Sequence, residues 1–492
     1  MKTDKGILLL ITLIFLIILP FFYLHQGLLL IDTGREFFIP SQILNGGVLF
    51  KDIFNIYGAL SYQFNALIFI IFGQRLETLA ITGVLNSFLI IITLYLLARE
   101  FLNKRISFLF TLFIMFSLVF RTFLYNSNMP YSFAIVYALS SFLLSLLFLI
   151  KYTKNNKPVF AYFACFFAGI SIANKYEFLL YLGVLIYALK DLGIKNSLKA
   201  FCCFCLVPLI SYGTLIFQGL KPDDIKLSAE LISNLINAPL IKQFFIKTSF
   251  TVFNSGIFSV FAFFPVINII LLILWRKTIL KNKVLFVFIL SAITAGAKSF
   301  LVLNVNHMGV FLLPVCTLAL ILMLKIKYQK ALPFILTAFI LIFAADDFNS
   351  LKAKDYFLIT DKGNINTYTK DGKLTEAAIG LVFDNTNSQD RVVVLPEGSI
   401  INFITDRKGD NTYYNLSPLF YYDVFGEERV LKHFKENLPE YFLILPIDNR
   451  EYGYSFFGRD YAQKFNEIIL ENYNLIQEKN QIKMFKKINN LL

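Results

Sequence analysis

Three ionisable side chains lie directly after the first strongly apolar stretch of the chain. They are Asp32, Arg35 and Glu36, in a sequence of which only 16% of the residues are charged. Placing such groups beside hydrocarbon is costly, so they usually carry function or pair with one another. A carboxylate at this position could accept a proton from an attacking hydroxyl, and the guanidinium could hold an anion. The competing interpretation is a salt-bridged cap that ends the preceding helix.

Further cations lie near the ends of other apolar stretches, on what we predict below to be the same side of a membrane: Arg75, Lys175, Lys298 and His307. Arginine pairs with phosphate in a bidentate manner, and lysine supplies a point charge. Cations beside a carboxylate at membrane depth suit a reaction on a lipid-linked phosphate. Lys175 and Lys298 each end an apolar run, and snorkelling to the lipid headgroups is the alternative for each.

The composition predicts that these residues sit on a polytopic membrane protein. The chain has 492 residues, of which 57% are hydrophobic, with 56 Phe and one Trp, and its mean hydropathy is +0.64. The first apolar run, residues 6–24, follows Lys2 and Lys5 and lacks a small-residue cleavage site, so we interpret it as a retained signal anchor. The five cysteines fall inside apolar runs, without the spacing of metal ligands, and are expected neither in a metal site nor in disulfides.

The distribution of Lys and Arg predicts about eleven spans and a cytoplasmic N-terminus. The connections expected in the cytoplasm, residues 99–105, 151–157, 190–199, 276–283 and 325–330, are short and basic and contain only two acids, Glu100 and Asp191. This positive-inside pattern accounts for the net charge of +13 without a nucleic-acid partner. The predicted spans are residues 7–24, 78–98, 106–125, 132–150, 159–174, 176–189, 199–217, 250–275, 284–300, 308–324 and 331–345.

The pattern holds only if Tyr57 to Gly73 does not cross the membrane, although this stretch is apolar. If it crossed, all five basic connections would lie outside. We therefore place it in an external loop, residues 25–77, as a helix on or dipping into the membrane surface. The same loop is expected to contain an amphipathic helix at about residues 36–45.

The tail, residues 346–492, differs in kind from the core, residues 1–345. Short apolar runs at 391–396 and 441–446 predict buried strands, each ended by a proline. Residues 373–383, 427–437 and 462–472 predict amphipathic helices, and residues 482–487 a final edge strand. We expect a small extracytoplasmic α/β domain with a parallel or mixed sheet, serving structural support or acceptor recognition rather than chemistry.

The first external loop resembles a known family. Asp32-Thr-Gly-Arg-Glu-Phe-Phe-Ile-Pro, Leu49-Phe-Lys-Asp and Tyr57-Gly-Ala-Leu-Ser-Tyr are similar to the corresponding loop of GT-C membrane glycosyltransferases, in the branch of protein O-mannosyltransferases and the lipid A aminoarabinose transferase. The resemblance covers roughly residues 1–180 and the remaining spans by layout. It implies inverting transfer of a sugar from a polyprenyl-phosphate carrier to an extracytoplasmic acceptor, with Asp32 as base, Glu36 in the same loop and Lys175 at the post-span lysine position.

Two features depart from the family pattern. Many relatives carry a second acidic residue in the next external loop, whereas Asn126 to Tyr131 contains no carboxylate. Tyr57-Gly58-Ala59 also replaces the Lys-Pro or Gly-Pro pattern before the second loop helix. A two-acid mechanism that uses the loop of residues 126–131 is therefore in doubt, and the donor pocket is expected to differ from that of the best-known members.

We therefore predict a GT-C-like glycosyltransferase in which Asp32 is the base and Arg35, Arg75, Lys175, Lys298 and His307 surround the donor phosphate. The acceptor is a glycan, lipid or protein, and the residue usage suggests a bacterial inner membrane. No cofactor is predicted, although a divalent cation between Asp32 and Glu36 stays open. The alternatives are a transporter or flippase of lipid-linked or anionic substrates, with charges deep within spans, and a non-catalytic assembly partner.

Overall fold

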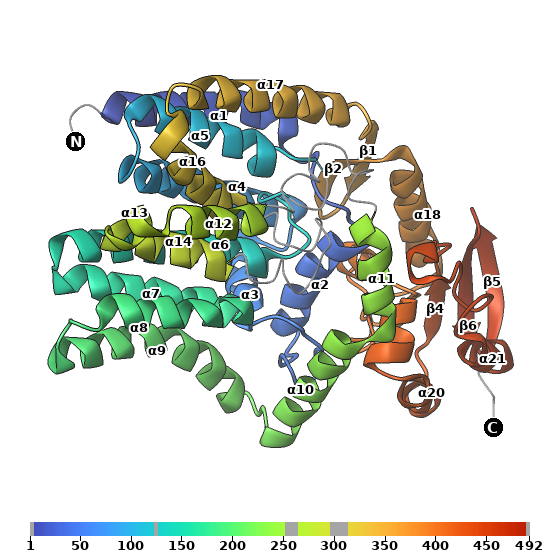
Figure 1. Cartoon of the computed structure of the whole chain (residues 1–492). Helices are drawn as coiled ribbons and strands as arrows, with labels where there is room; N and C mark the ends of the chain where they lie inside the picture. Colours follow the sequence, from blue (N-terminus) through green and yellow to red (C-terminus); the bar gives the residue numbers. More distant parts are fainter. Residues whose placement is uncertain (1–3, 123–125, 251–263, 296–312, 489–492) are drawn as a thin grey trace.

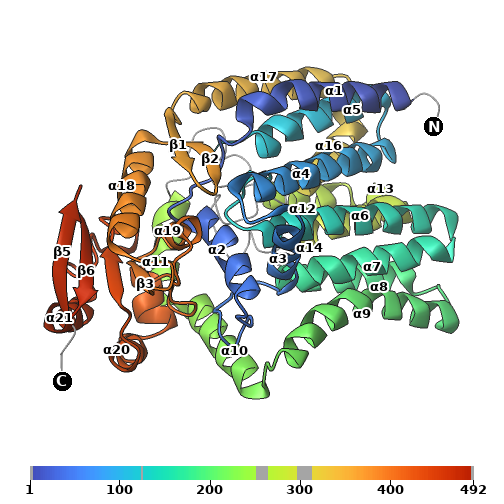
Figure 2. The same ribbon diagram turned by 180° about the vertical axis from the view of Figure 1, so that it is seen from behind.

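The chain folds into a helical half and a smaller C-terminal α/β half that lie side by side (Figures 1 and 2). The computed structural model describes residues 4–122, 126–250, 264–295 and 313–488. Within these residues five helices are long and apolar enough to cross a membrane: α1 (Lys5–Phe22), α4 (Leu76–Arg99), α6 (Phe133–Asn155), α9 (Ile194–Phe217) and α17 (Leu332–Leu351). The protein is a multi-pass helical membrane protein.

Each remaining predicted span overlaps a shorter helix. These are α5 (Lys104–Ile114) with the π-helix η1 (Met115–Val119), α7 (Pro158–Asn174), the 3-10 helix η2 (Tyr176–Leu180) with α8 (Tyr181–Leu189), α12 (Phe264–Leu274), α14 (Lys283–Ala295) and α16 (Leu313–Tyr328). Parts of the stretches 106–125, 250–275, 284–300 and 308–324 lie outside the described residues. The order of helices thus agrees with the predicted layout, while the number of actual crossings stays a prediction.

Helix α6 lies at the centre of the helical half and 89% of its most apolar window is buried. Small polar side chains hold it against α7: the Ser145 hydroxyl donates to the Ala164 carbonyl at 2.7 Å, and the Ser171 hydroxyl donates to the Ala138 carbonyl at 2.9 Å. Such small residues allow close helix approach where hydrophobic burial cannot drive association.

The external segment contains two short helices, α2 (Asp32–Leu44) and α3 (Leu60–Phe72), which pack on each other. Helix α2 begins at Asp32, four residues earlier than predicted for the helix around residues 36–45. Helix α3 has 13 residues, as many as α14, so its exclusion from the span count stays a prediction. Two further helices not predicted from the sequence, α10 (Pro222–Asn237) and α11 (Pro239–Phe250), run from α9 towards the C-terminal half (Figure 1).

Helix α17 continues to Leu351, six residues past residue 345, the end of the predicted last span. A hairpin of β1 (Tyr356–Thr360) and β2 (Gly363–Thr367), which the sequence analysis missed, leads into α18 (Thr369–Asn385). Helices α20 (Glu427–Glu436) and α21 (Gln463–Asn472) confirm two further predictions. The C-terminal half also contains helix α19 (Ser399–Thr405) and the π-helix η6 (Leu419–Val424).

A mixed four-stranded sheet in the order β3-β4-β6-β5 forms the core of this half. Strands β3 (Val392–Leu395) and β4 (Tyr441–Ile444) are parallel, and β6 (Ile482–Lys487) is antiparallel to both β4 and β5 (Tyr473–Lys479). The prediction that residues 482–487 form the edge strand is wrong, because β5 pairs outside β6. Strand β5 escaped prediction because only Tyr473 of it is buried, so the apolar signal of a strand is weak.

Candidate active site

The first turn of α2 carries three charged side chains, Asp32, Arg35 and Glu36. Arg35 Nη1 lies 3.3 Å from Asp32 Oδ1, and Arg35 Nε lies 3.6 Å from Glu36 Oε1. The Asp32 side chain is 33% exposed, whereas those of Arg35 and Glu36 are 9% and 0% exposed. Arg35 therefore lies between two carboxylates, and of these only Asp32 is open to an incoming group.

Gly34 sets the position of this turn. A Cβ atom there would lie 2.1 Å from the Leu29 carbonyl oxygen and 2.7 Å from the Cβ of Ile400. Only glycine permits this approach between α2 and α19, which belongs to the C-terminal half. The ring of Phe37 packs on Phe403 at 5.4 Å along the same contact. The C-terminal half is thus in direct contact with the turn that holds Asp32.

Glu36 is fully buried and both of its oxygens are occupied. Tyr62 of α3 donates its hydroxyl to Oε1 at 2.7 Å, and the backbone N–H of Phe133 donates to Oε2 at 2.8 Å. Burial raises the pKa of this carboxyl, and the charge of Arg35 and these two donors oppose the rise. The arrangement ties α2 to α3 and to the start of α6, and it fixes one side of Arg35.

Lys175 joins the group from the end of α7. It is 5% exposed, and its Nζ lies 4.5 Å from the centre of the Tyr57 ring, while the guanidinium of Arg35 lies 5.6 Å from the same ring. The described ion pair of Lys175, with Glu177, is long at 3.8 Å. A Lys-to-aromatic contact stabilises the cation without neutralising it.

Gly58 explains why Tyr57 lies beneath Lys175. Its N–H donates to the Asn174 carbonyl at 2.9 Å, and a Cβ atom would lie 1.9 Å from the carbonyl oxygen of Ala173. The external loop is therefore fastened to the end of α7 by backbone contact, and the residue before Gly58 meets the residue after Asn174. The departure from the family pattern at residues 57–59 is where this contact forms.

Two carboxyl groups of the C-terminal half interact electrostatically with Asp32. Glu397 follows β3, and Glu451 lies on the 3-10 turn η7 (Arg450–Tyr452). Burial raises the pKa of Asp32, against the charge of Arg35. Burial and the charges of Asp32 and Glu451 raise the pKa of Glu397 to about 8. Asn415 donates to Glu397 Oε2 at 2.8 Å and orients it.

The segment that carries Asn415 is fastened to the external loop. The Tyr414 hydroxyl donates to the Phe54 carbonyl at 3.2 Å, and the Phe54 N–H donates to the Asn411 carbonyl at 3.3 Å. At its start, Asp410 accepts from the backbone N–H groups of Thr412 and Tyr413. Residues 410–415 therefore connect Glu397 to the loop of residues 48–57 through hydrogen bonds.

The structure brings together Asp32, Arg35, Glu36 and Lys175 among the predicted site residues. Arg75 instead pairs with Glu77 at 3.3 Å, and Glu77 accepts from the N–H of Asn364, at the junction of α4 with the β1–β2 hairpin. Lys298 and His307 lie outside the described residues. Sequence reasoning missed Glu397 and Glu451, for which no spacing signal exists.

A divalent cation shared by Asp32 and Glu36 does not fit the observed arrangement. Arg35 lies between the two carboxylates, and both Glu36 oxygens already accept hydrogen bonds. In the part of the chain that the structure describes, no group of three or more His, Cys, Asp or Glu side chains is placed to hold a metal ion.

Comparisons with known proteins bear on this fold. The profile of the dolichyl-phosphate-mannose-protein mannosyltransferase family matches residues 60–212, from α3 to α9. This range includes Lys175 but not Asp32. A comparison of the sequence with curated proteins finds no match.

Three solved structures show the fold. ArnT from Cupriavidus metallidurans bound to undecaprenyl phosphate has a TM-score of 0.55 over 99% of both chains, at 10% identity. The oligosaccharyltransferase AglB from Archaeoglobus fulgidus, in complex with an inhibitory peptide and a dolichol-phosphate, has a TM-score of 0.51 at 13% identity and covers 90% of this chain and 69% of that one. The Archaeoglobus fulgidus oligosaccharyltransferase in complex with Zn and sulfate has a TM-score of 0.52 at 12% identity, over 89% and 67%. The predicted resemblance to GT-C glycosyltransferases is confirmed.

Proposed function

We propose that the protein moves a sugar from a polyprenyl phosphate to a hydroxyl group of an acceptor on the external side of the membrane. The observation that carries the proposal is the meeting of Arg35 and Lys175 on one tyrosine ring, beside the partly exposed carboxylate of Asp32. Two similar folds support the donor class, since one was solved with undecaprenyl phosphate and another with dolichol-phosphate.

The donor phosphate binds between Arg35 and Lys175. Both cations are largely buried and come from elements far apart in the sequence. A buried ammonium with only a long ion pair retains much of its attraction for an anion, because little of its charge is neutralised locally. The ring of Tyr57 spaces the two cations, and the polyprenyl chain extends from the phosphate along the lipid-facing helices.

Asp32 acts as the general base. It takes the proton of the acceptor hydroxyl as the acceptor oxygen bonds to the anomeric carbon, and the bond from that carbon to the phosphate oxygen breaks. The polyprenyl phosphate leaves with the bonding electrons, and Arg35 and Lys175 stabilise the added negative charge. Attack opposite the leaving phosphate inverts the anomeric centre. Burial raises the pKa of Asp32, which strengthens it as a base.

Glu36 is a positioning residue in this scheme, because it is sealed from solvent and acts through Arg35. Glu397 supplies the second carboxyl of the site, in place of the acid that the loop of residues 126–131 lacks. With its pKa raised to about 8, Glu397 stays largely protonated at neutral pH. Asp32 is then the ionised member, as expected for neighbouring carboxyls. We place Glu397 on the acceptor side, where a protonated carboxyl donates a hydrogen bond to a hydroxyl-bearing acceptor.

The proposed setting is a bacterial inner membrane with the site and the C-terminal half outside the cytoplasm. The experiment is to incubate purified full-length protein with radiolabelled polyprenyl-phosphate sugars and a cell-envelope extract, and to follow loss of label from the donor. We expect one donor sugar to be consumed and to appear on an acceptor. Movement of donor across sealed vesicles with no transfer would contradict the proposal and favour the transporter alternative.

A further inference from the structure

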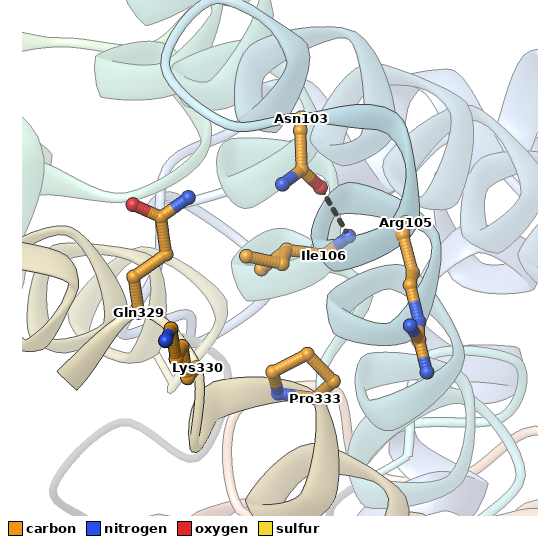
Figure 3. A pocket seen from close by; sticks show the side chains of 6 residues that line it. All are labelled: Asn103, Arg105, Ile106, Gln329, Lys330 and Pro333. Atoms are coloured by element: carbon orange, nitrogen blue, oxygen red, sulfur yellow. Dashed lines mark hydrogen bonds between the residues drawn. The ribbon is translucent and has the colours of Figure 1, made fainter.

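A separate cavity lies at the opposite end of the helical half from Asp32, where the basic connections cluster. It has a volume of about 580 Å³ and is lined by Asn103, Arg105, Ile106, Gln329, Lys330 and Pro333. Figure 3 shows that its walls come from the start of α5 and from the turn between α16 and α17. None of these residues takes part in the proposed transfer.

The chemistry of the lining fits an anion. Two cations from different elements, Arg105 and Lys330, reach the cavity, together with two amides and no carboxylate. Asn103 Oδ1 already accepts from the N–H of Ile106 at 3.0 Å, which leaves its amide donor for another partner. Ile106 and Pro333 supply apolar surface between the polar groups.

Among the described cations of this face, some form ion pairs, whereas Arg105 and Lys330 do not. Arg99 pairs with Asp4, Lys154 with Glu100 and Lys283 with Asp191. Among the described residues no ion pair is formed by Arg105 or Lys330, and both are exposed. Their charges therefore stay available to an external anion.

The surroundings identify the anion as part of a lipid. Pro333 lines the cavity, and the next residue along α17, Phe334, is 76% exposed. Helix α17 is one of the candidate membrane spans and is mostly exposed along its apolar window. A molecule with its anionic head in the cavity would lay its acyl chains along this apolar surface. Basic sites between helices on the cytoplasmic side are suited to such headgroups.

We propose that this cavity binds the phosphate-bearing headgroup of an anionic membrane lipid, held by Arg105 and Lys330. The site stands independently of the proposed glycosyl transfer, since it shares no residue with the Asp32 group.

The test is native mass spectrometry of the full-length protein in detergent, titrated with phosphatidylglycerol, phosphatidylcholine or inorganic phosphate. We expect one molecule of phosphatidylglycerol to bind, and R105Q/K330Q to weaken it about 30-fold. The matched control is K157Q/K195Q, which removes two exposed cations from the same face. It should change the affinity by less than about threefold, because screened surface charges act weakly on a site they do not touch.

A second variant guards against loss of folding. Q329E adds a carboxylate to the cavity without removing a cation. It should weaken the binding of phosphatidylglycerol, while the melting temperature of the lipid-free protein stays unchanged. Unchanged binding in R105Q/K330Q would overturn the proposal. Binding of phosphatidylcholine as tightly as phosphatidylglycerol would show that the site does not select for headgroup charge. Binding of inorganic phosphate as tightly would show that no lipid is required. Either result would also overturn it.

Discussion

The two ends of the helical half carry charge in opposite ways. One end carries Asp32 and three buried charged residues: Arg35 is 8% exposed, Glu36 0% and Lys175 5%. At the other end, cations such as Lys157 and Lys195 are exposed. Burying a charge is costly unless it is paired and hydrogen-bonded, whereas a solvated lysine costs little. The buried set forms the proposed site, and the exposed set follows the basic pattern that predicts the cytoplasmic side.

The partners of the charges differ in the same way. Arg35 donates to the Tyr131 carbonyl, and Glu36 accepts from Tyr62 and Phe133, so the buried set joins segments from across the fold. At the opposite end the described pairs, such as Lys154 with Glu100, link neighbouring connections at the surface. Substitutions should therefore have large effects at one end and small effects at the other.

The variant R35A should have the largest effect among substitutions of the cations. It removes a donor to the leaving phosphate, for which we expect a loss of about 10²–10³-fold in kcat. It also leaves Glu36 buried without its cation, which should cost about 3–5 kcal/mol of stability. Donor turnover and thermal unfolding measure the two effects. Activity within tenfold of the wild type would contradict the role of Arg35.

The variant K175M keeps the apolar stem and removes the charge. We expect a loss of about 10–100-fold in kcat/KM, smaller than for R35A, because lysine supplies a point charge and Arg35 remains. The matched control is K195M, a lysine at the opposite end, which should leave kcat/KM unchanged. Equal effects of the two variants would break the distinction between the ends.

The variant E397Q tests the contribution of the C-terminal half through pH. Because the pKa of Glu397 is raised to about 8 in the folded protein, the folded state holds a proton that the unfolded state has released. Its contribution to stability is therefore fully present below pH ~4.3 and is lost as the pH rises through about 8. E397Q should flatten this loss in melting curves recorded between pH 5 and 9.

The same variant should change the pH–rate profile. Above pH ~8 the ionised Glu397 no longer donates a hydrogen bond to the acceptor and adds negative charge beside Asp32, so kcat/KM of the wild type should fall, and E397Q should remove that limb. The amide oxygen of the glutamine can still accept the hydrogen bond from Asn415. E397Q therefore removes the charge of residue 397 and keeps this hydrogen bond. An unchanged alkaline limb in E397Q would contradict the placement of Glu397 beside the site.

Substitution of Lys354 should have the smallest effect of these variants. Lys354 makes stability rise with pH, whereas Glu397 makes it fall. Lys354 is 2% exposed, donates to the Gly27 carbonyl at 2.6 Å, and burial lowers its pKa to about 7. The unfolded state then binds more protons between pH ~7 and ~10.4, so this residue makes stability rise with pH across that window. K354M should remove the rise without changing donor turnover at pH 7. A melting temperature with unchanged pH dependence would show that Lys354 is solvated.

Much of the fold was predictable because hydropathy and charge report directly on membrane insertion. The basic connections placed Tyr57 to Gly73 outside the spans, which stays a prediction, and proline-ended apolar runs correctly predicted β3 and β4. Strand β5 and the hairpin of β1 and β2 were missed because their exposed residues carry no apolar alternation. Helices α10 and α11 were missed because the topology rule assigns the connection between two predicted spans to one side of the membrane but predicts no secondary structure within it.

The site was predictable only where a charge stood next to an apolar run. Asp32, Arg35 and Lys175 satisfied that condition, and the structure brings them together. Arg75 satisfied it too, yet pairs with Glu77 at another junction. Glu397 lies in a polar region among many carboxylates, and its proximity to Asp32 results from the contact of α2 with α19 at Gly34. Such long-range packing leaves no local signal.

In the proposed mechanism Asp32 removes a proton during transfer and does not serve to hold the donor. The most direct measurement compares donor binding and donor turnover in purified wild type and D32N. We predict that D32N binds the polyprenyl-phosphate sugar within about threefold of the wild type, because Arg35 and Lys175 remain, while turnover falls by at least about 10²-fold. Turnover retained in D32N, or binding lost in step with turnover, would contradict the account.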